Sequence, residues 1–134
     1  MTKDEIKGSV IQYWLRKADT ALESAHSEVA AGRFDFATNR VYYACFYAAS
    51  AVLLEIGLRF VKHAGVRGAI HQHLVKTGKL DAKWAKAYDR IFENRQMADY
   101  LELYEPEEAH LEELLHQAEG FVSEMKLLLG TKVP

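Results

Sequence analysis

The chain has 134 residues, 49% of them hydrophobic, and its formal net charge at pH 7 is −2. That length accommodates one domain with a substantial core, residues 1–134, and is too short for two ordinary domains. A charge this close to neutral excludes a general attraction to nucleic acid or to an anionic membrane, so any such binding must come from a local patch.

The first predicted element is an amphipathic helix over residues 3–31, because apolar side chains recur there at steps of three and four residues. Gly32 ends this helix. Asp35 or Thr38 then offers a side-chain oxygen that can cap the next helix. The turn between the two is short, so we expect them to pack antiparallel. The apolar positions of the first helix are Ile11, Trp14, Ala18, Ala21, Ala25 and Val29.

A central helix is predicted over residues 36–56, ending at Gly57. Apolar or aromatic side chains fall on nearly every side of it, so other helices must enclose it. Arg40 shares one stripe with Phe36, Tyr43 and Tyr47. A guanidinium on such a face needs a negatively charged partner, either within the protein or from a ligand.

Residues 58–80 differ in kind, since they contain five Lys or Arg, three His, three Gly and no acidic residue. A short helix across Val66 to Val75 is the most that we expect there. Residues 99–124, by contrast, contain nine acidic residues and no Lys or Arg. Either the two segments attract each other, within one chain or across a dimer, which is the commoner arrangement, or the basic one faces phosphate and the acidic one binds a basic partner.

A third helix is predicted from a cap at Asp81 to about Tyr100, with Arg95 on its packed stripe. Asp99 follows Arg95 by four residues, so the two can pair along the helix or serve a functional cleft. Pro106 suits the first turn of a fourth long helix that ends at Gly130. The stripe of the third helix comprises Trp84, Tyr88, Ile91, Arg95 and Ala98, and the apolar seam of the fourth includes Leu111, Leu114, Ala118, Phe121 and Met125.

The fold expected from these elements is an all-α up-and-down bundle of four long helices, with a short helix in the 58–80 connection. The N-terminus is polar and lacks the apolar core of a secretory signal. No run approaches the twenty or so apolar residues of a membrane span. The single cysteine, Cys45, is more typical of a small buried side chain than of a nucleophile or a disulfide. We therefore expect a cytoplasmic protein that does not associate with membranes.

Four short motifs occur in order, each at a boundary of the predicted helices. Together they resemble the HEPN (higher eukaryotes and prokaryotes nucleotide-binding) domain family, and most closely its small stand-alone prokaryotic members. The resemblance covers nearly the whole chain. The motifs are Asn39-Arg40-x-Tyr42-Tyr43-Ala44-x-Phe46-Tyr47, Lys62-His63-x-Gly65-Val66, Val75-Lys76-Thr77-Gly78 and Arg95-x-x-Ala98-Asp99-Tyr100.

The resemblance implies a homodimeric helical bundle paired with a minimal nucleotidyltransferase in a toxin–antitoxin system. Active members are metal-independent ribonucleases in which an Arg is followed, after four to six residues, by a His. Here the corresponding positions after Arg95 hold Tyr100, Leu101 and Glu102. The usual group that titrates near neutrality is therefore missing, which puts ribonuclease activity by the usual route in doubt.

The remaining residues suggest how such a site would work. Arg95 can supply the cation over a phosphorane, with Asp99 beside it. His63, in a basic loop with glycine hinges, would replace the missing His more readily than His71 or His73. Tyr100 is a poor base but a candidate acid. For binding nucleotide or phosphate, the candidates are Arg40, Lys62, Arg67 and Tyr43, although Arg40 and the tyrosines also suit a structural role.

Modification and metal binding are two further questions. In some pairs of this family the nucleotidyltransferase adenylylates a tyrosine just after the Arg motif, which here would be Tyr100 or Tyr104. We expect no metal and no cofactor, because His71 and His73 point about 200° apart on a helix and no ligand lies at a suitable spacing. The first functional hypothesis is therefore an interaction module that binds a nucleotidyltransferase, with RNA or nucleotide as the shared ligand. The alternative is a divergent ribonuclease toxin that uses Arg95 with a loop His, and a third is a bundle without any ligand.

Overall fold

The computed structural model describes residues 1–100 and 104–130, and within these ranges every regular element is a helix. The long helices are α1 (Lys3–Ala30), α2 (Phe34–Glu55), α4 (Ala82–Tyr100) and α5 (Glu108–Gly130). A short helix α3 (His63–Ala69) continues directly into a π-helical segment, η1 (Ile70–Val75). This arrangement confirms the predicted all-α bundle of four long helices with a helical connection between the second and third.

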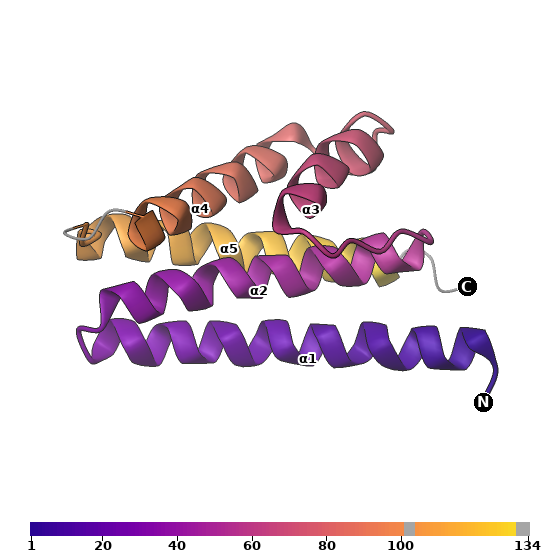
Figure 1. The fold of residues 1–134 in the computed structure, drawn as a ribbon, viewed down its shortest axis with the longest axis horizontal. Coiled ribbons are helices and arrows are strands. Elements are labelled where there is room, and N and C mark those ends of the chain that lie inside the picture. Colours follow the sequence, from indigo (N-terminus) through magenta and orange to yellow (C-terminus); the bar gives the residue numbers. More distant parts are fainter. Residues whose placement is uncertain (101–103, 131–134) are drawn as a thin grey trace.

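The helix α2 is the centre of the bundle, as its apolar sequence predicts. It packs antiparallel along α1 and is also contacted by α3, α4 and α5 (Figure 1). Small side chains such as Ala18, Ala44 and Ala48 are fully buried, and they allow the two helix backbones to approach closely. The largest fully buried side chains include Tyr42, Tyr88, Phe121, Leu53 and Leu111.

The start of α2 differs from the prediction. The helix begins at Phe34, and its cap residue Arg33 makes no side-chain capping hydrogen bond. Asp35 and Thr38 already lie inside the helix, where the Thr38 hydroxyl donates to the Phe34 carbonyl at 2.9 Å. Gly32, with φ of 75°, makes the turn so short that the chain re-enters a helix before either predicted cap.

The 58–80 connection is more helical than predicted, because α3 begins at His63, three residues before Val66. Gly65 and Gly68 lie inside this helix and do not interrupt it. A Cβ on Gly65 would come within 2.9 Å of the Phe60 ring, so the glycine is what lets that ring pack. Burial of Val66, Ala69, Ile70 and Leu74 offsets the conformational cost of the glycines.

The two C-terminal helices lie close to their predicted bounds. Asp81 accepts a hydrogen bond from the Lys83 backbone N–H at 2.9 Å and so caps α4, as expected. The helix α5 begins at Glu108, two residues after the buried Pro106, and ends at Gly130 as predicted. Throughout the described residues, no helix has the length and apolar character needed to cross a membrane.

Candidate functional site

Arg95 lies on α4 against two aromatic rings of α2. Its guanidinium carbon is 4.7 Å from the centroid of the Tyr42 ring and 5.2 Å from that of Tyr43, which are cation–π distances. Arg95 Nε also lies 3.4 Å from Asp99 Oδ2, which is the ion pair along the helix that was one of the two roles predicted for these residues. This Nε is buried without a hydrogen bond, and only 22% of the side chain is exposed. The Nη groups make no hydrogen bond to any described residue, so Arg95 retains donors for a ligand.

His63 is the first residue of α3, and the structure brings it to the same aromatic cluster. Its Nδ1 lies 2.6 Å from the Tyr42 hydroxyl, and its ring stacks on Phe46 with centroids 4.5 Å apart. The pKa of His63 is lowered, because burial disfavours the charged imidazole and the positive charge of Arg95 opposes it further. The imidazole is therefore neutral at pH 7. Tyr42 thus contacts both predicted site residues, His63 and Arg95.

The protonation of Tyr42 fixes the tautomer of His63. Burial raises the pKa of Tyr42 to about 12, so its hydroxyl keeps its proton at neutral pH. This hydroxyl is buried and is hydrogen-bonded to His63 Nδ1, and the neighbouring Tyr88 hydroxyl, which lowers the pKa of Tyr42, interacts with it as a donor. A buried hydroxyl donates to the acceptor available, because leaving its proton unpaired is costly. We therefore assign the imidazole proton to Nε2, which makes His63 a donor toward any ligand.

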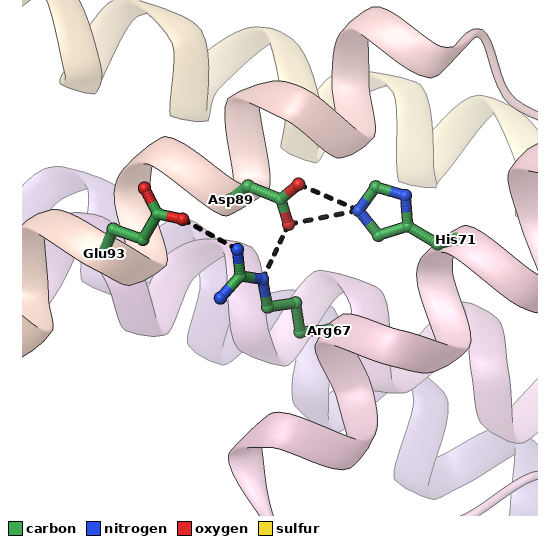
Figure 2. Close-up of polar contacts among 4 residues, drawn as sticks. All are labelled: Arg67, His71, Asp89 and Glu93. Carbon is green, nitrogen blue, oxygen red and sulfur yellow. Dashed lines mark hydrogen bonds and ion pairs between the residues drawn. The ribbon is translucent and has the colours of Figure 1, made fainter.

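A second polar cluster joins α3 and η1 to α4 (Figure 2). Arg67 Nε donates to Asp89 at 2.9 Å, and its Nη2 donates to Glu93 at 2.8 Å. His71 Nε2 lies 2.9 Å from the other Asp89 oxygen, and the Arg67 guanidinium is 4.8 Å from the Phe92 ring centroid. Two carboxylates already offset the positive charge of the Arg67 guanidinium, although its Nη1 makes no hydrogen bond to a described residue. The cluster instead fixes the orientation of α3, whose first residue is His63.

This cluster also corrects the expected attraction between the basic and acidic segments within one chain. Within the described residues, the ion pairs of residues 56–80 go to Asp89 and Glu93 on α4, and none goes to residues 99–124. In the acidic segment Glu119 pairs with His26 of α1, and Asp99 pairs with Arg95. The reason is proximity, because α3 and η1 pack more closely against α4 than against α5.

The comparison with known proteins decides the family. The model of the HEPN domain matches residues 11–128. The chain belongs to the HEPN domain family. A UPF0332 protein of Thermotoga maritima is 42% identical over 123 residues, which are 92% of this chain and 93% of that protein. Two Methanocaldococcus jannaschii proteins carry the name "putative toxin". One is 31% identical over 88% of this chain and 80% of its own length, and the other is 33% identical over 69% of each.

In this HEPN domain the described position Tyr100 does not take the place of the usual His next to the guanidinium. Tyr100 is 79% exposed and makes no contact with Arg95, while Leu101 and Glu102 lie outside the described residues. The imidazole in the cluster comes instead from His63, far away in the sequence. Tyr42 and Phe46 complete the cluster. The sequence predicts a structural role for the tyrosines and assigns no role to Phe46, although Tyr42 and Phe46 both belong to the first of the four motifs.

Two other predicted phosphate ligands lie apart from this cluster. Arg40 and Lys62 are exposed, and neither makes a hydrogen bond or an ion pair with a described residue. The expectation that Arg40 lies on a packed face and needs a partner is therefore wrong. Phe36 on the same stripe is 60% exposed, so this side of α2 faces solvent at its N-terminal end. Tyr43, by contrast, is half-buried and contacts both Arg95 and His63.

The two candidate modification sites differ in accessibility. The Tyr104 hydroxyl donates to Asn94 Oδ1 at 2.6 Å, and its side chain is half-buried. Tyr100 is largely exposed at the C-terminal end of α4. His71 and His73 lie in η1, and His71 is bound to Asp89. No group of three or more His, Cys, Asp or Glu side chains suited to a metal ion occurs in residues 1–100 and 104–130.

Proposed function

We propose that this HEPN protein is the toxin-type member of a two-protein pair and that its Arg95–His63 site binds a phosphate group of RNA or of a nucleotide. One observation carries the proposal: Arg95 and His63 contact the same buried tyrosine while keeping donors that no described residue uses. Charged donors in a partly desolvated setting bind phosphate well. The names of the two Methanocaldococcus jannaschii relatives support the toxin-type role.

The tautomer of His63 favours binding over base catalysis. With its Nδ1 occupied by Tyr42, the neutral imidazole offers an N–H at Nε2 and no free lone pair there. Such a group can donate to a phosphate oxygen but cannot take a proton from a ribose hydroxyl. Arg95 cannot act as a base either, since it stays protonated. The pair is therefore suited to holding a phosphate.

Equilibrium binding of a fluorescent single-stranded RNA tests this site. We expect Arg95→Met to weaken binding by about tenfold or more, because it removes the charged donors of the site. The slope of log affinity against log salt concentration should also become shallower, by the amount expected for about one phosphate contact. Arg33→Met is the matched control, because Arg33 is an exposed arginine that pairs with Glu28 at the opposite end of α1 from Lys3. Equal affinities for the wild type and the Arg95 variant would contradict the proposal.

The partner that we propose is a minimal nucleotidyltransferase, bound by a HEPN homodimer. The resemblance on which this rests is now supported by family membership, and the pairing itself is open to a direct test. A tagged chain should retain the nucleotidyltransferase encoded by an adjacent gene when the two are co-expressed. Sedimentation of the chain alone should give twice its 15.2 kDa mass. A monomer that retains no nucleotidyltransferase would refute this part of the proposal.

Tyr100 is the better of the two candidate sites for adenylylation by such a partner. Its hydroxyl would attack the α-phosphate of ATP and release pyrophosphate, which requires access to the phenol oxygen. Tyr100 is 79% exposed, whereas the Tyr104 hydroxyl is engaged by Asn94. Peptide mass spectrometry after co-expression should find one added AMP on Tyr100 and lose it in Tyr100→Phe. The modification should persist in Tyr104→Phe, and an AMP on Tyr104 alone would refute the assignment.

The alternative function is a divergent metal-independent ribonuclease, favoured by the meeting of His63 and Arg95 at Tyr42. Cleavage through the 2′-hydroxyl needs a base, an acid and a cation. It would require the other tautomer of His63, with its Nε2 lone pair free. RNA cleavage in EDTA, together with growth arrest on expression, should then be lost in both Arg95→Met and His63→Gln. His116→Gln, at an exposed histidine of α5, is the control. Activity unchanged in both site variants would exclude this route.

A further inference from the structure

A cavity of about 280 Å³ lies between α1, the C-terminal half of α2 and the segment that leads to α3. Four aromatic side chains line it together with aliphatic ones, and the aromatic ones are Trp14, Phe46, Tyr47 and Phe60. The segment over residues 57–62 runs back along α2 before α3 begins (Figure 1). Neither Arg95 nor His63 lines this cavity. It is therefore a separate site that the proposed phosphate contact does not use.

Two polar side chains at the cavity are free to bind a ligand. Ser50 and Arg59 both line it, and neither makes a hydrogen bond or an ion pair with a described residue. The Arg59 guanidinium carbon is 5.8 Å from the centroid of the Trp14 ring, so the cation lies beside an aromatic wall. Residues 56–80 contain no acidic side chain. An anionic group on a ligand would therefore not be repelled by any carboxylate of this segment.

We propose that this cavity binds the base of a nucleotide, with the phosphate at Arg59. Aromatic walls stack on planar heterocycles, and a free hydroxyl such as that of Ser50 can pair with a ring nitrogen or exocyclic group. A volume near the lower end of small-ligand pockets suits one such ring and its sugar. The choice of a nucleotide among planar anions rests on the proposed function, which the cavity extends with a second and separate contact.

The cavity is coupled to the proposed phosphate site through one shared ring. Phe46 lines the cavity, and the His63 imidazole stacks on the same ring with centroids 4.5 Å apart and planes at 12°. A base that shifts the Phe46 ring changes the ring current that this ring exerts on His63, and hence the resonances of His63. The histidine therefore reports occupancy of the cavity even though it does not line it.

The test uses ¹⁹F NMR of the full chain labelled with 5-fluorotryptophan. Trp14 lines the cavity, whereas Trp84 lies on α4 against Gly120 and serves as an internal control. AMP should shift the Trp14 resonance and leave that of Trp84 in place. Adenosine should act similarly at higher concentration, and ribose 5-phosphate should have at least tenfold weaker effect than AMP because it lacks a base. Equal potency of AMP and ribose 5-phosphate, or no shift with AMP or adenosine, would overturn the proposal.

Variants separate this site from the one at Arg95. Ser50→Leu fills the cavity and should weaken the binding of both AMP and adenosine at least tenfold. Arg59→Gln changes an exposed side chain. It should reduce the affinity for AMP to that for adenosine and leave the affinity for adenosine unchanged. Arg16→Gln, an exposed arginine of α1, is the control. Arg95→Met should leave adenosine binding intact, so a failure at Arg95 and a failure at the cavity give different results. Unchanged AMP binding in Arg59→Gln would refute the phosphate assignment.

Discussion

At the scale of single residues, Tyr42 organises the candidate site. Its ring lies beneath the Arg95 guanidinium, and its hydroxyl is paired with His63 Nδ1. It is fully buried, and because the neighbouring Tyr88 acts as a donor toward it, its own proton goes to His63 Nδ1 and sets the tautomer of the imidazole. A single buried side chain thus sets both the position of a cation and the tautomer of a histidine.

The first prediction concerns this hydrogen bond. Long-range ¹H–¹⁵N spectra of the wild type should show His63 protonated at Nε2 and unprotonated at Nδ1. Tyr42→Phe should release this preference and lower the free energy of unfolding by about 1 kcal/mol, the usual value of one such hydrogen bond. Phe46→Leu is a control that removes the stacking ring and keeps the hydroxyl. A wild-type spectrum with the proton on Nδ1 would contradict the assignment and favour the ribonuclease alternative.

The second prediction concerns pH. The pKa of His63 is lowered in the folded protein, first by burial and then by Arg95, so the unfolded chain binds the proton more readily. The resulting stability is fully present above about pH 6.5, the ordinary value, and is lost as the pH falls through 6.5 toward the lower folded pKa. An NMR titration should place the His63 midpoint below about 6.5. Arg95→Met should raise that midpoint, and Arg33→Met should not.

At the scale of the helices, close contacts fix the position of α4, which carries Arg95. The Trp84 ring lies over Gly120 of α5, where an added Cβ would come within 2.5 Å of the indole. At the other side of α4, Asp89 and Glu93 hold Arg67 of α3 (Figure 2). Close packing of Trp84 against Gly120 therefore fixes one side of α4, and the ion pairs of Arg67 fix the other. Both contacts position the Arg95 guanidinium relative to Tyr42.

The third prediction tests the close packing of Trp84 against Gly120. Gly120→Ala should lower the free energy of unfolding by about 1–3 kcal/mol, because the indole or the helix must move. Gly8→Ala is the matched control, since Gly8 lies inside α1 and an added Cβ there meets nothing within 4 Å. That variant should gain up to about 1 kcal/mol from helix propensity. Chemical denaturation measures both, and equal shifts of the same sign would contradict the argument.

At the scale of the whole molecule, one cluster of buried side chains includes residues of every helix. The largest share of it comes from α2, which contacts α1, α3, α4 and α5. The loss of any one helix would therefore expose apolar surface on another. This is the arrangement expected of a chain that unfolds in one step.

The fourth prediction follows from this shared core. Unfolding by denaturant should be a single transition, with coincident curves from far-UV circular dichroism and from tryptophan fluorescence. Trp14 reports on α1 and Trp84 reports on α4. Replacing one tryptophan at a time, in Trp14→Phe and in Trp84→Phe, isolates the fluorescence of the other. The fluorescence midpoints of the two variants should agree after correction for the effect of each substitution on stability. Two separated midpoints would show that the chain unfolds in parts and would contradict the single domain predicted from its length.

Comparison of the sequence predictions with the structure shows which features are local. The long helices were predicted nearly to the residue, because helical periodicity, Asp81 as a cap and Gly57 as a stop are properties of neighbouring residues. The pairing of Arg95 with Asp99 is local in the same way, since both lie on one helix, four residues apart. The helical start at His63 was missed because its stability comes from burial against the rest of the bundle and not from its own glycine-containing sequence.

Arg40 and Arg95 illustrate the limit of sequence alone. Each lies on an aromatic helical stripe, yet one is exposed and the other is packed against two tyrosines. A stripe indicates which residues share a face of a helix, but whether another helix covers that face depends on the packing of the bundle. The local sequence thus determined the helices, their ends and the family motifs. Only the tertiary structure placed His63 beside Tyr42 and Arg95, because contacts between distant segments depend on how helices pack and not on periodicity within one helix.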